Sequence, residues 1–194
     1  MLPKHQHIVR IGLCGCGPRG LATIERYRHI PCAQFVAVAD LQPNRAEEAV
    51  RLLRRQEVAA EIMSSEELMH RADVDLVLVC TEWGAHAPLA VAAMEAGKDV
   101  AVEVPLANTI QKCRQILDAQ SRTERRCFML ENCCYDMFHL GAAALVRQGK
   151  IGEVTHVECA YIHWLDENAA IGYHGNPYPT HGIGPMMQLL QAID

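Results

Sequence analysis

The chain has 194 residues, of which 50% are hydrophobic and 21% are charged, and its formal net charge is -5. This length accommodates one full domain and part of another, while the mild acidity argues against nucleic acid and no basic run indicates a membrane surface as partner. No stretch approaches the ~20 apolar residues that span a bilayer, and the polar start MLPKHQH lacks the hydrophobic region of a signal peptide.

The nine cysteines are an odd number and are scattered along the chain. Cys14, Cys80 and Cys159 lie in apolar strand contexts, where cysteine packs as a small hydrophobe. Cys133 and Cys134 are neighbours that could bind metal or cycle between redox states, but no second pair at ligand spacing accompanies them. The pattern is typical of a reduced, cytoplasmic protein without a metal site.

The first predicted strand, residues 8–13, leads into the glycine-rich loop GCGPRG. Gly15 permits a tight turn, the missing side chain of Gly17 lets the backbone approach a pyrophosphate, and Gly20 lets the next helix pack against the strand. The N-terminus of that helix would offer free N–H groups and a positive dipole end to phosphates. The loop therefore predicts a phosphate-binding turn.

An acidic residue, Asp40, follows the second predicted strand, residues 35–39. Its carboxylate can accept hydrogen bonds from a ribose diol and would repel a 2′-phosphate, which favours NAD over NADP. Strand, loop, helix and acid together predict a dinucleotide-binding βαβ unit. The alternative is a tight turn in another α/β protein with Asp40 solvated. Arg19 either lies over the pyrophosphate or is an ordinary exposed arginine.

Further short apolar runs alternate with helical patterns along the chain. The runs at residues 76–80, 100–104 and 128–130 suit parallel strands that are buried on both faces. Strands that alternate with helices predict an α/β fold with a Rossmann doubly wound parallel sheet, whose ligand lies beyond the carboxyl ends of the strands. Helices are predicted over residues 43–56, 85–96, 109–125 and 136–148, with a further helix capped by Ser64 or Ser65 ahead of Glu66 and Glu67.

After Gly149 the pattern changes. Residues 150–165 alternate and are β-rich, which predicts the entry to a second, more open sheet, and residues 181–193 are compatible with a helix. One strand and one helix cannot close a sheet domain. We therefore expect an NAD-binding Rossmann domain over residues 1–132 and the start of an incomplete α+β domain, for substrate or oligomerisation, over residues 133–194.

A series of short sequence blocks occurs in a characteristic order. GCGPRG, TEWGAHAPLA and VAVEVPLA are followed by ENCCY, YIH and YPTHGIGP. Over nearly the whole chain this order resembles the glucose–fructose oxidoreductase, inositol dehydrogenase and MocA superfamily. The EVP block and the last three blocks resemble its NAD-dependent glycosidase branch, glycoside hydrolase family 109, typified by α-N-acetylgalactosaminidases. The resemblance implies NAD as cofactor and a carbohydrate as substrate.

The resemblance also implies which residues bind the cofactor. They are Pro18, Arg19 and Asp40 beside the glycines, Trp83 and His86 near the nicotinamide half, Glu103 and Val104 in the EVP block, and Asn132 near the nicotinamide ribose. Dehydrogenases of the superfamily usually have EKP, with a lysine that assists proton transfer. Val104 stands at that position here, which resembles the glycosidase branch. Glu131 either hydrogen-bonds its own loop or makes a second cofactor contact.

The resemblance implies a catalytic group of Tyr161, Tyr178 and His181. Family enzymes pass a hydride from the sugar 3-position to NAD, lose the proton at the 2-position, eliminate the glycosidic bond, add water and return the hydride. Proton transfer needs a group whose pKa lies near working pH. Histidine meets this need, so we expect His181 to move the proton while the tyrosines donate hydrogen bonds or relay protons. His163 either supports this group or faces solvent.

Three departures from the family pattern leave three functions open. Glu82 replaces a proline, Trp164 replaces an acid, and no arginine lies between Tyr161 and Tyr178. The C-terminal half of the family pattern is also missing, which predicts exposed apolar surface and a homo-oligomer. The chain is expected to be an NAD-dependent glycosidase, or an NAD-dependent sugar or cyclitol dehydrogenase, or a truncated non-catalytic NAD-binding module.

Overall fold

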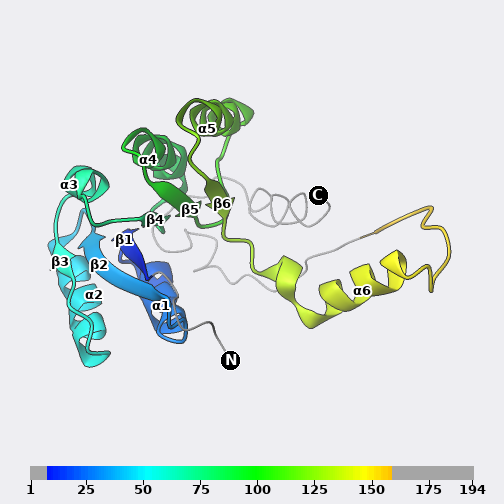
Figure 1. The fold of residues 1–194 in the computed structure, drawn as a ribbon, viewed down its shortest axis with the longest axis horizontal. Coiled ribbons are helices and arrows are strands. Elements are labelled where there is room, and N and C mark those ends of the chain that lie inside the picture. Colours follow the sequence, from blue (N-terminus) through cyan, green and yellow to red (C-terminus); the bar gives the residue numbers. More distant parts are fainter. Residues whose placement is uncertain (1–7, 159–194) are drawn as a thin grey trace, which may run out of the picture. The chain divides into compact units, whose positions relative to one another are not determined.

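A computed structural model describes residues 8–158, and the chain divides into two compact units between Met129 and Leu130. The first unit is a sheet of six parallel strands in the order β3-β2-β1-β4-β5-β6 (Figure 1). The strands are β1 (Val9–Cys14), β2 (Ala33–Ala39), β3 (Glu61–Ile62), β4 (Leu76–Val79), β5 (Asp99–Val102) and β6 (Cys127–Met129). The helices are α1 (Pro18–Tyr27), α2 (Pro43–Arg55), α3 (Ser65–His70), α4 (Trp83–Glu95) and α5 (Ile110–Thr123).

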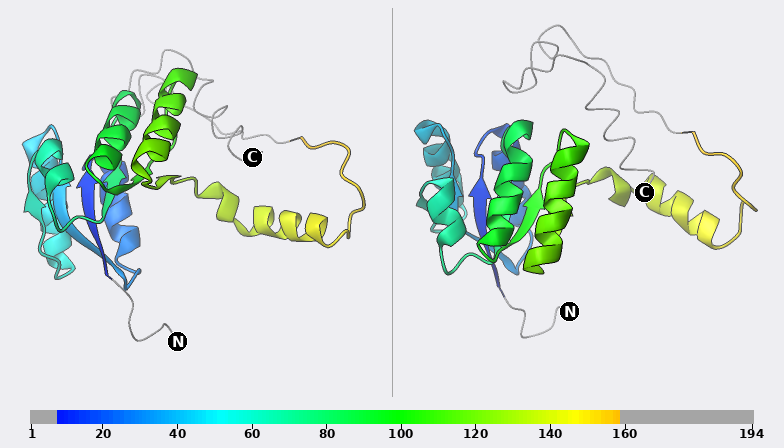
Figure 2. Two further views of the ribbon diagram at one scale, coloured as in Figure 1. Left: turned by 45° about the horizontal axis from the view of Figure 1, so that its top comes forward. Right: turned by 90° about the horizontal axis from the view of Figure 1, so that it is seen from above.

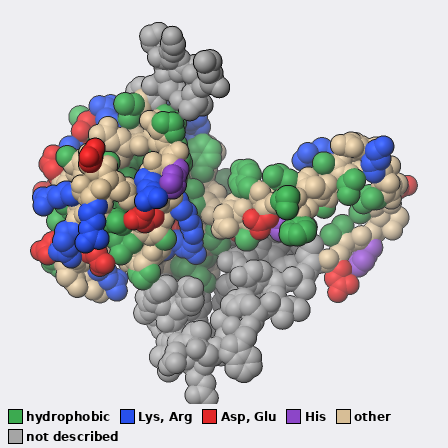
Figure 3. All heavy atoms as spheres, turned by 90° about the horizontal axis from the view of Figure 1, so that it is seen from below, with side chains coloured by type: hydrophobic (Ala, Val, Ile, Leu, Met, Phe, Trp, Pro, Cys, Tyr) green, Lys and Arg blue, Asp and Glu red, His purple; other side chains and the backbone are tan. Residues whose placement is uncertain are grey.

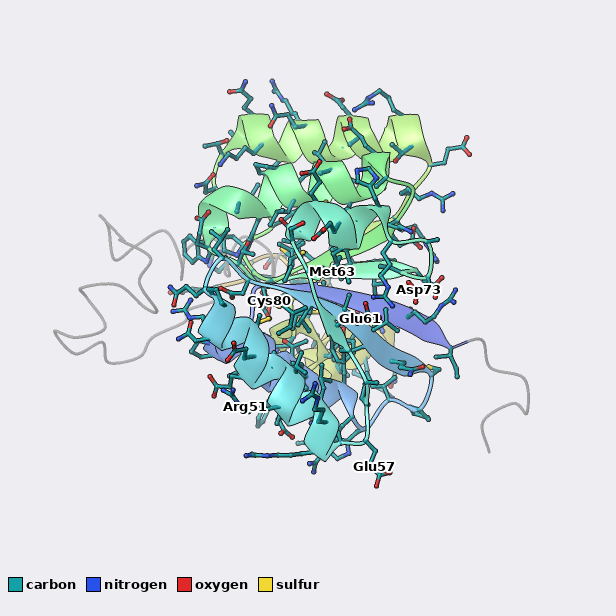
Figure 4. All side chains as sticks on the ribbon, turned by 90° about the vertical axis from the view of Figure 1, so that its left-hand side faces the viewer. Arg51, Glu57, Glu61, Met63, Asp73 and Cys80 are labelled. Carbon is teal, nitrogen blue, oxygen red and sulfur yellow. The ribbon has the colours of Figure 1, made fainter. Side chains whose placement is uncertain are left out.

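The helices form a layer on each face of this sheet. Figure 4 looks along the sheet from its β3 side, with α1 and α2 on one face and α3, α4 and α5 on the other, and Figure 2 gives two further views of the same layers. The chain runs outward from β1 to β3 and then returns to place β4 beside β1. This reversal of strand order is where doubly wound sheets bind ligands. The predicted Rossmann fold is confirmed.

The central strands are mostly apolar and buried toward their carboxyl ends, because helices cover both faces of the sheet. Leu13 of β1 and Leu78 of β4 pair across the sheet, and both are fully buried. The predicted strands therefore match the observed ones to within two residues at each end. The two-residue strand β3 was not predicted, because both of its residues are exposed and no apolar run marks it.

Helix α3 begins at the predicted cap. The Ser64 hydroxyl accepts a hydrogen bond from the N–H of Glu67, and the Glu67 carboxylate accepts one from the N–H of Ser64 at 2.9 Å. This reciprocal pair satisfies two donors that the first turn would otherwise leave without partners. The bonds from Ser64 to the carboxylate also hold the pKa of Glu67 below its usual value.

The described part of the second unit contains a short 3-10 helix, Cys133–Tyr135, and the predicted helix α6 (Met137–Arg147). Apolar side chains gather over α6 in Figure 3, and Phe138 is 83% exposed. Residues 153–158 form no strand, because no second strand pairs with them in the described range, and the rest of that predicted strand lies outside it. Between residues 8 and 158, no helix has both the length and the apolar run that crossing a bilayer would require.

The buried sheet centre allows a direct test of the fold. We expect Leu78→Ala to lower the free energy of unfolding by about 2–5 kcal/mol, because Leu78 is fully buried and the change leaves a cavity. Leu117→Ala is the matched control: Leu117 is 60% exposed on α5, so its loss should change stability by less than about 0.5 kcal/mol. Denaturant titration followed by circular dichroism measures both. Equal effects would contradict this assignment of the core.

Candidate dinucleotide-binding site

Two of the three loop glycines are required by the packing of the protein itself. Gly15 has a φ of 95°, a left-handed conformation that favours glycine, and a Cβ there would lie 2.5 Å from the carbonyl of Cys80. A Cβ at Gly20 would overlap the carbonyl oxygen of Gly15. The loop between β1 and α1 is therefore pressed against both α1 and the end of β4.

Gly17 is different, because the protein leaves space beside it. Its φ of -68° suits any residue, and the nearest atom to a Cβ there would be a guanidinium nitrogen of Arg45 at 3.9 Å. Gly17 is the N-cap of α1 and supplies no side-chain cap. Within the described range, the N–H groups of Gly17, Arg19 and Gly20 donate no hydrogen bond. These donors at an open helix N-terminus fit a diphosphate.

Asp40 ties the glycine loop to the end of β2. One carboxylate oxygen accepts the N–H of Cys16 at 2.7 Å, and the other accepts the N–H of Gln42 at 2.8 Å. A carboxylate offers about four acceptor positions in all, so each oxygen retains a position for a ribose hydroxyl. The side chain is half-buried and stands where the sequence predicted a ribose contact.

The sequence analysis missed two residues beside Asp40. Leu41 follows it directly and is wholly exposed, which presents an apolar surface beside the predicted ribose position. Arg45, in the first turn of α2, extends its guanidinium toward Gly17 and could pair with a phosphate. Two features of the sequence could have pointed to them. Leu41 is an apolar residue in an otherwise polar turn, and Arg45 is an arginine five residues after Asp40.

On the other side of β1, an ion pair links the glycine loop to the end of β5. The Arg19 guanidinium lies 3.6 Å from one carboxylate oxygen of Glu103, whose other oxygen accepts the N–H of Val104. Arg19 is therefore neither unpaired nor simply exposed. The pair places a cation between the phosphate-binding turn and the EVP block.

His86 lies in the interior rather than at the surface of the site. It is 1% exposed, its Nδ1 is 2.7 Å from the carbonyl oxygen of Pro105, and its Nε2 is 3.1 Å from that of Thr81. Each ring nitrogen thus lies within hydrogen-bonding distance of a backbone carbonyl, and the one that carries the proton donates, so His86 packs between the loops after β4 and β5. Its predicted contact with the nicotinamide half of the cofactor stays a prediction. Trp83, the first residue of α4, is only partly buried.

Three buried thiols lie in or next to the glycine loop. Burial raises the pKa of Cys14, Cys16 and Cys80 to about 12, so these thiols stay neutral at physiological pH and pack as hydrophobes. Figure 4 labels Cys80, just beyond β4. In residues 8–158 every cysteine is a free thiol, and no group of three His, Cys, Asp or Glu side chains is arranged to hold a metal.

In the second unit, Glu131 is 9% exposed and has one satisfied carboxylate oxygen. Oε1 accepts the N–H of Cys133 at 2.9 Å, whereas Oε2 is buried without a partner in the described range. Asn132 is exposed beside it. The loop hydrogen bond that the sequence offered as one alternative is therefore present. Burial, then the charge of Glu131, raises the pKa of Cys133.

The predicted catalytic group lies outside the described residues. Tyr161, Tyr178 and His181, and with them His163, follow residue 158. The residues predicted to contact the cofactor all lie within the described range, and both their assignment and that of the catalytic group stay predictions.

Comparison with known proteins agrees with this geometry. Residues 9–131 match a family model described as an oxidoreductase family with an NAD-binding Rossmann fold. A "glycosyl hydrolase family 109 protein 2" from Phocaeicola vulgatus is 42% identical over 93% of this chain and 49% of its own length. An α-N-acetylgalactosaminidase from Bacteroides fragilis is 39% identical over 94% of this chain and 48% of its own length. The chain spans about half the length of the curated relatives it matches.

A solved structure shares the same architecture. The myo-inositol dehydrogenase from Lactobacillus casei, in complex with NAD(H) and myo-inositol, superimposes with a TM-score of 0.69 and 27% identity. The match covers 75% of this chain and 43% of the dehydrogenase chain.

Substitutions at Gly17 and Gly20 distinguish an effect on NAD binding from an effect on folding. We expect Gly17→Ala to leave the melting temperature unchanged, because its backbone and surroundings accept a Cβ, and to weaken NAD binding by about tenfold or more, because the methyl group holds the diphosphate off the amides. Gly20→Ala is the contrasting variant and should destabilise the fold through its overlap with Gly15. Thermal melts and calorimetric NAD titration measure the two effects. Unchanged NAD affinity in Gly17→Ala would show that the diphosphate does not lie there.

Proposed function

The chain belongs to the Gfo/Idh/MocA oxidoreductase family with its NAD-binding Rossmann fold, and from this membership we propose that it binds NAD at the carboxyl ends of its strands and uses it to cleave a glycosidic bond. The observation that carries the proposal is the open N-terminus of α1 at Gly17, flanked by Asp40 and the Arg19–Glu103 pair. These groups fit a diphosphate and a ribose diol.

The order of the strands gives the direction of the bound cofactor. Asp40 directly follows β2 and would hold the adenosine ribose, while Gly17 after β1 would hold the diphosphate. The nicotinamide half then continues past β1, over the ends of β4 and β5. Residues 81–84 and 103–105 follow these two strands and would flank it.

NAD would supply a reversible hydride acceptor at the sugar 3-position, and the protein would supply positioning and proton transfer. Oxidation there acidifies the proton at the 2-position, which His181 is proposed to remove before the leaving group departs. Tyr161 and Tyr178 are proposed to stabilise the oxygen that gains charge. Val104 cannot donate a proton, in keeping with the glycosidase assignment. The similarity to family 109 proteins over 93–94% of this chain supports this activity.

A second candidate is a sugar or cyclitol dehydrogenase that reduces NAD stoichiometrically. The observation that favours it is the shared architecture with an inositol dehydrogenase that binds NAD(H) and myo-inositol. A third candidate is a non-catalytic NAD-binding module, and the match of residues 9–131 to a family model with an NAD-binding Rossmann fold supports it. The three candidates differ in what accumulates during turnover.

Asp40 tests the choice of cofactor. We expect Asp40→Asn to shift the ratio of the dissociation constants for NADP and NAD by about tenfold toward NADP, because the variant removes the negative charge that would repel a 2′-phosphate. Any loosening of the loop at Cys16 affects both nucleotides and cancels in the ratio. Fluorescence titration with each nucleotide measures it. An unchanged ratio would place the adenosine ribose elsewhere.

The reaction itself is tested with a chromogenic α-N-acetylgalactosaminide. We expect release of the aglycone without growth of NADH absorbance, because the hydride returns to the sugar in every cycle. His181→Ala should abolish release while NAD affinity persists, and His29→Ala, an exposed histidine after α1, should leave both unchanged. Growth of NADH with sugars or cyclitols alone would favour the dehydrogenase. NAD binding without either signal would favour the module.

A further inference from the structure

Glu82 stands where the family pattern has proline, and the structure gives it a defined position. It is the N-cap of α4, and its carboxylate accepts the N–H of Gly84. The Nζ of Lys112 donates to the carbonyl oxygen of Gly84 at 3.0 Å. The carboxylate is therefore fixed at the start of α4, directly after the carboxyl end of β4.

This position is on the nicotinamide side of the proposed site. The loop of Gly15 lies against the backbone of Cys80 and Thr81, so the loop after β1 and the loop after β4 are neighbours. With the diphosphate on α1 and adenosine on the β2 side, the nicotinamide half must pass the loop that holds Glu82.

The negative charge of Glu82 is less compensated by nearby cations than that of Glu103, the other carboxylate on this side of the site. Glu103 is paired with Arg19 at 3.6 Å. Among the described residues, no Lys, Arg or His nitrogen lies within 4.0 Å of the Glu82 carboxylate, and the ammonium of Lys112 is bound to a backbone carbonyl. Glu82, in the loop between β4 and α4, is also exposed to solvent. Glu82 therefore adds a negative charge to the nicotinamide side of the proposed site, where Arg19 and Glu103 offset each other and the Lys112 ammonium lies on the carbonyl of Gly84.

We propose that Glu82 biases the bound cofactor toward its oxidised form. The nicotinamide ring is a cation in NAD and becomes neutral when it gains a hydride, so a nearby negative charge favours NAD over NADH. The diphosphate carries the same charge in both forms, so its repulsion by Glu82 cancels in the ratio of the two affinities. A glycosidase that begins each cycle by oxidising its substrate benefits from a cofactor held as NAD. This inference rests on the proposed function, since it requires that NAD be the ligand.

The test uses two variants that differ only in charge. Asp and Asn are both good N-cap residues of nearly equal size, so Glu82→Asp keeps a charged cap and Glu82→Asn provides a neutral one. We expect Glu82→Asn to shift the ratio of the NAD and NADH dissociation constants toward NADH by about three- to tenfold at low salt. Glu82→Asp should keep the ratio of the unmodified protein. High salt should reduce the difference between the variants, because exposed charges are screened.

Calorimetric titration with NAD and NADH gives the ratio, and thermal melts check that both variants are folded. Glu124→Gln is the control: it removes one carboxylate after the C-terminus of α5, at the opposite end of the strands, and should leave the ratio unchanged. Equal ratios in the Asp and Asn variants would overturn the proposal and leave Glu82 as a helix cap only. Absence of NAD and NADH binding in the unmodified protein would instead overturn the proposed function.

Discussion

The hydrogen bond from the N–H of Cys16 to Asp40 is the interaction on which the site depends. It joins the middle of the glycine loop to the end of β2, at 2.7 Å. The N–H of Gly15 donates to Ala39 beside it, so the loop is bound to β2 at two successive residues. A donor that faces Asp40 is not available to a phosphate. The amides that remain available are those of α1, and the loop is already shaped before a ligand arrives, which lowers the entropic cost of binding.

Acidic and basic residues occupy different positions along the carboxyl ends of the strands. The first turn of α1 carries no acidic residue, and the guanidinium of Arg45 extends toward it. Each of the neighbouring strands β2, β4 and β5 is followed by an acid within three residues, the last being Glu103. A dinucleotide has a central anion with a hydroxyl-rich nucleoside on either side. Amides at the centre and acceptors on both sides match that distribution, since carboxylates accept hydrogen bonds from hydroxyl groups.

The sequence predicted the features that depend on local pattern. Continuous apolar runs located the five longer strands, and Ser64 marked the start of α3. It could not predict β3, whose two exposed residues form a strand only because β2 lies beside them. Nor could it place His86, because its burial depends on carbonyls from two loops 24 residues apart, or the role of Arg45, because its reach toward Gly17 follows from how α1 and α2 pack.

The groups proposed to bind the cofactor and those proposed to cleave the glycosidic bond lie in different parts of this chain. The groups that fit a diphosphate and a ribose all lie between Gly15 and Glu103, in the unit that ends at Met129. Within that unit the residue at the family's lysine position is Val104, which cannot exchange a proton, and His86 is 1% exposed with a backbone carbonyl beside each ring nitrogen. A hydride can leave a hydroxyl carbon only if the hydroxyl proton also leaves. The residues proposed to accept that proton, Tyr161, Tyr178 and His181, all follow this unit in the sequence.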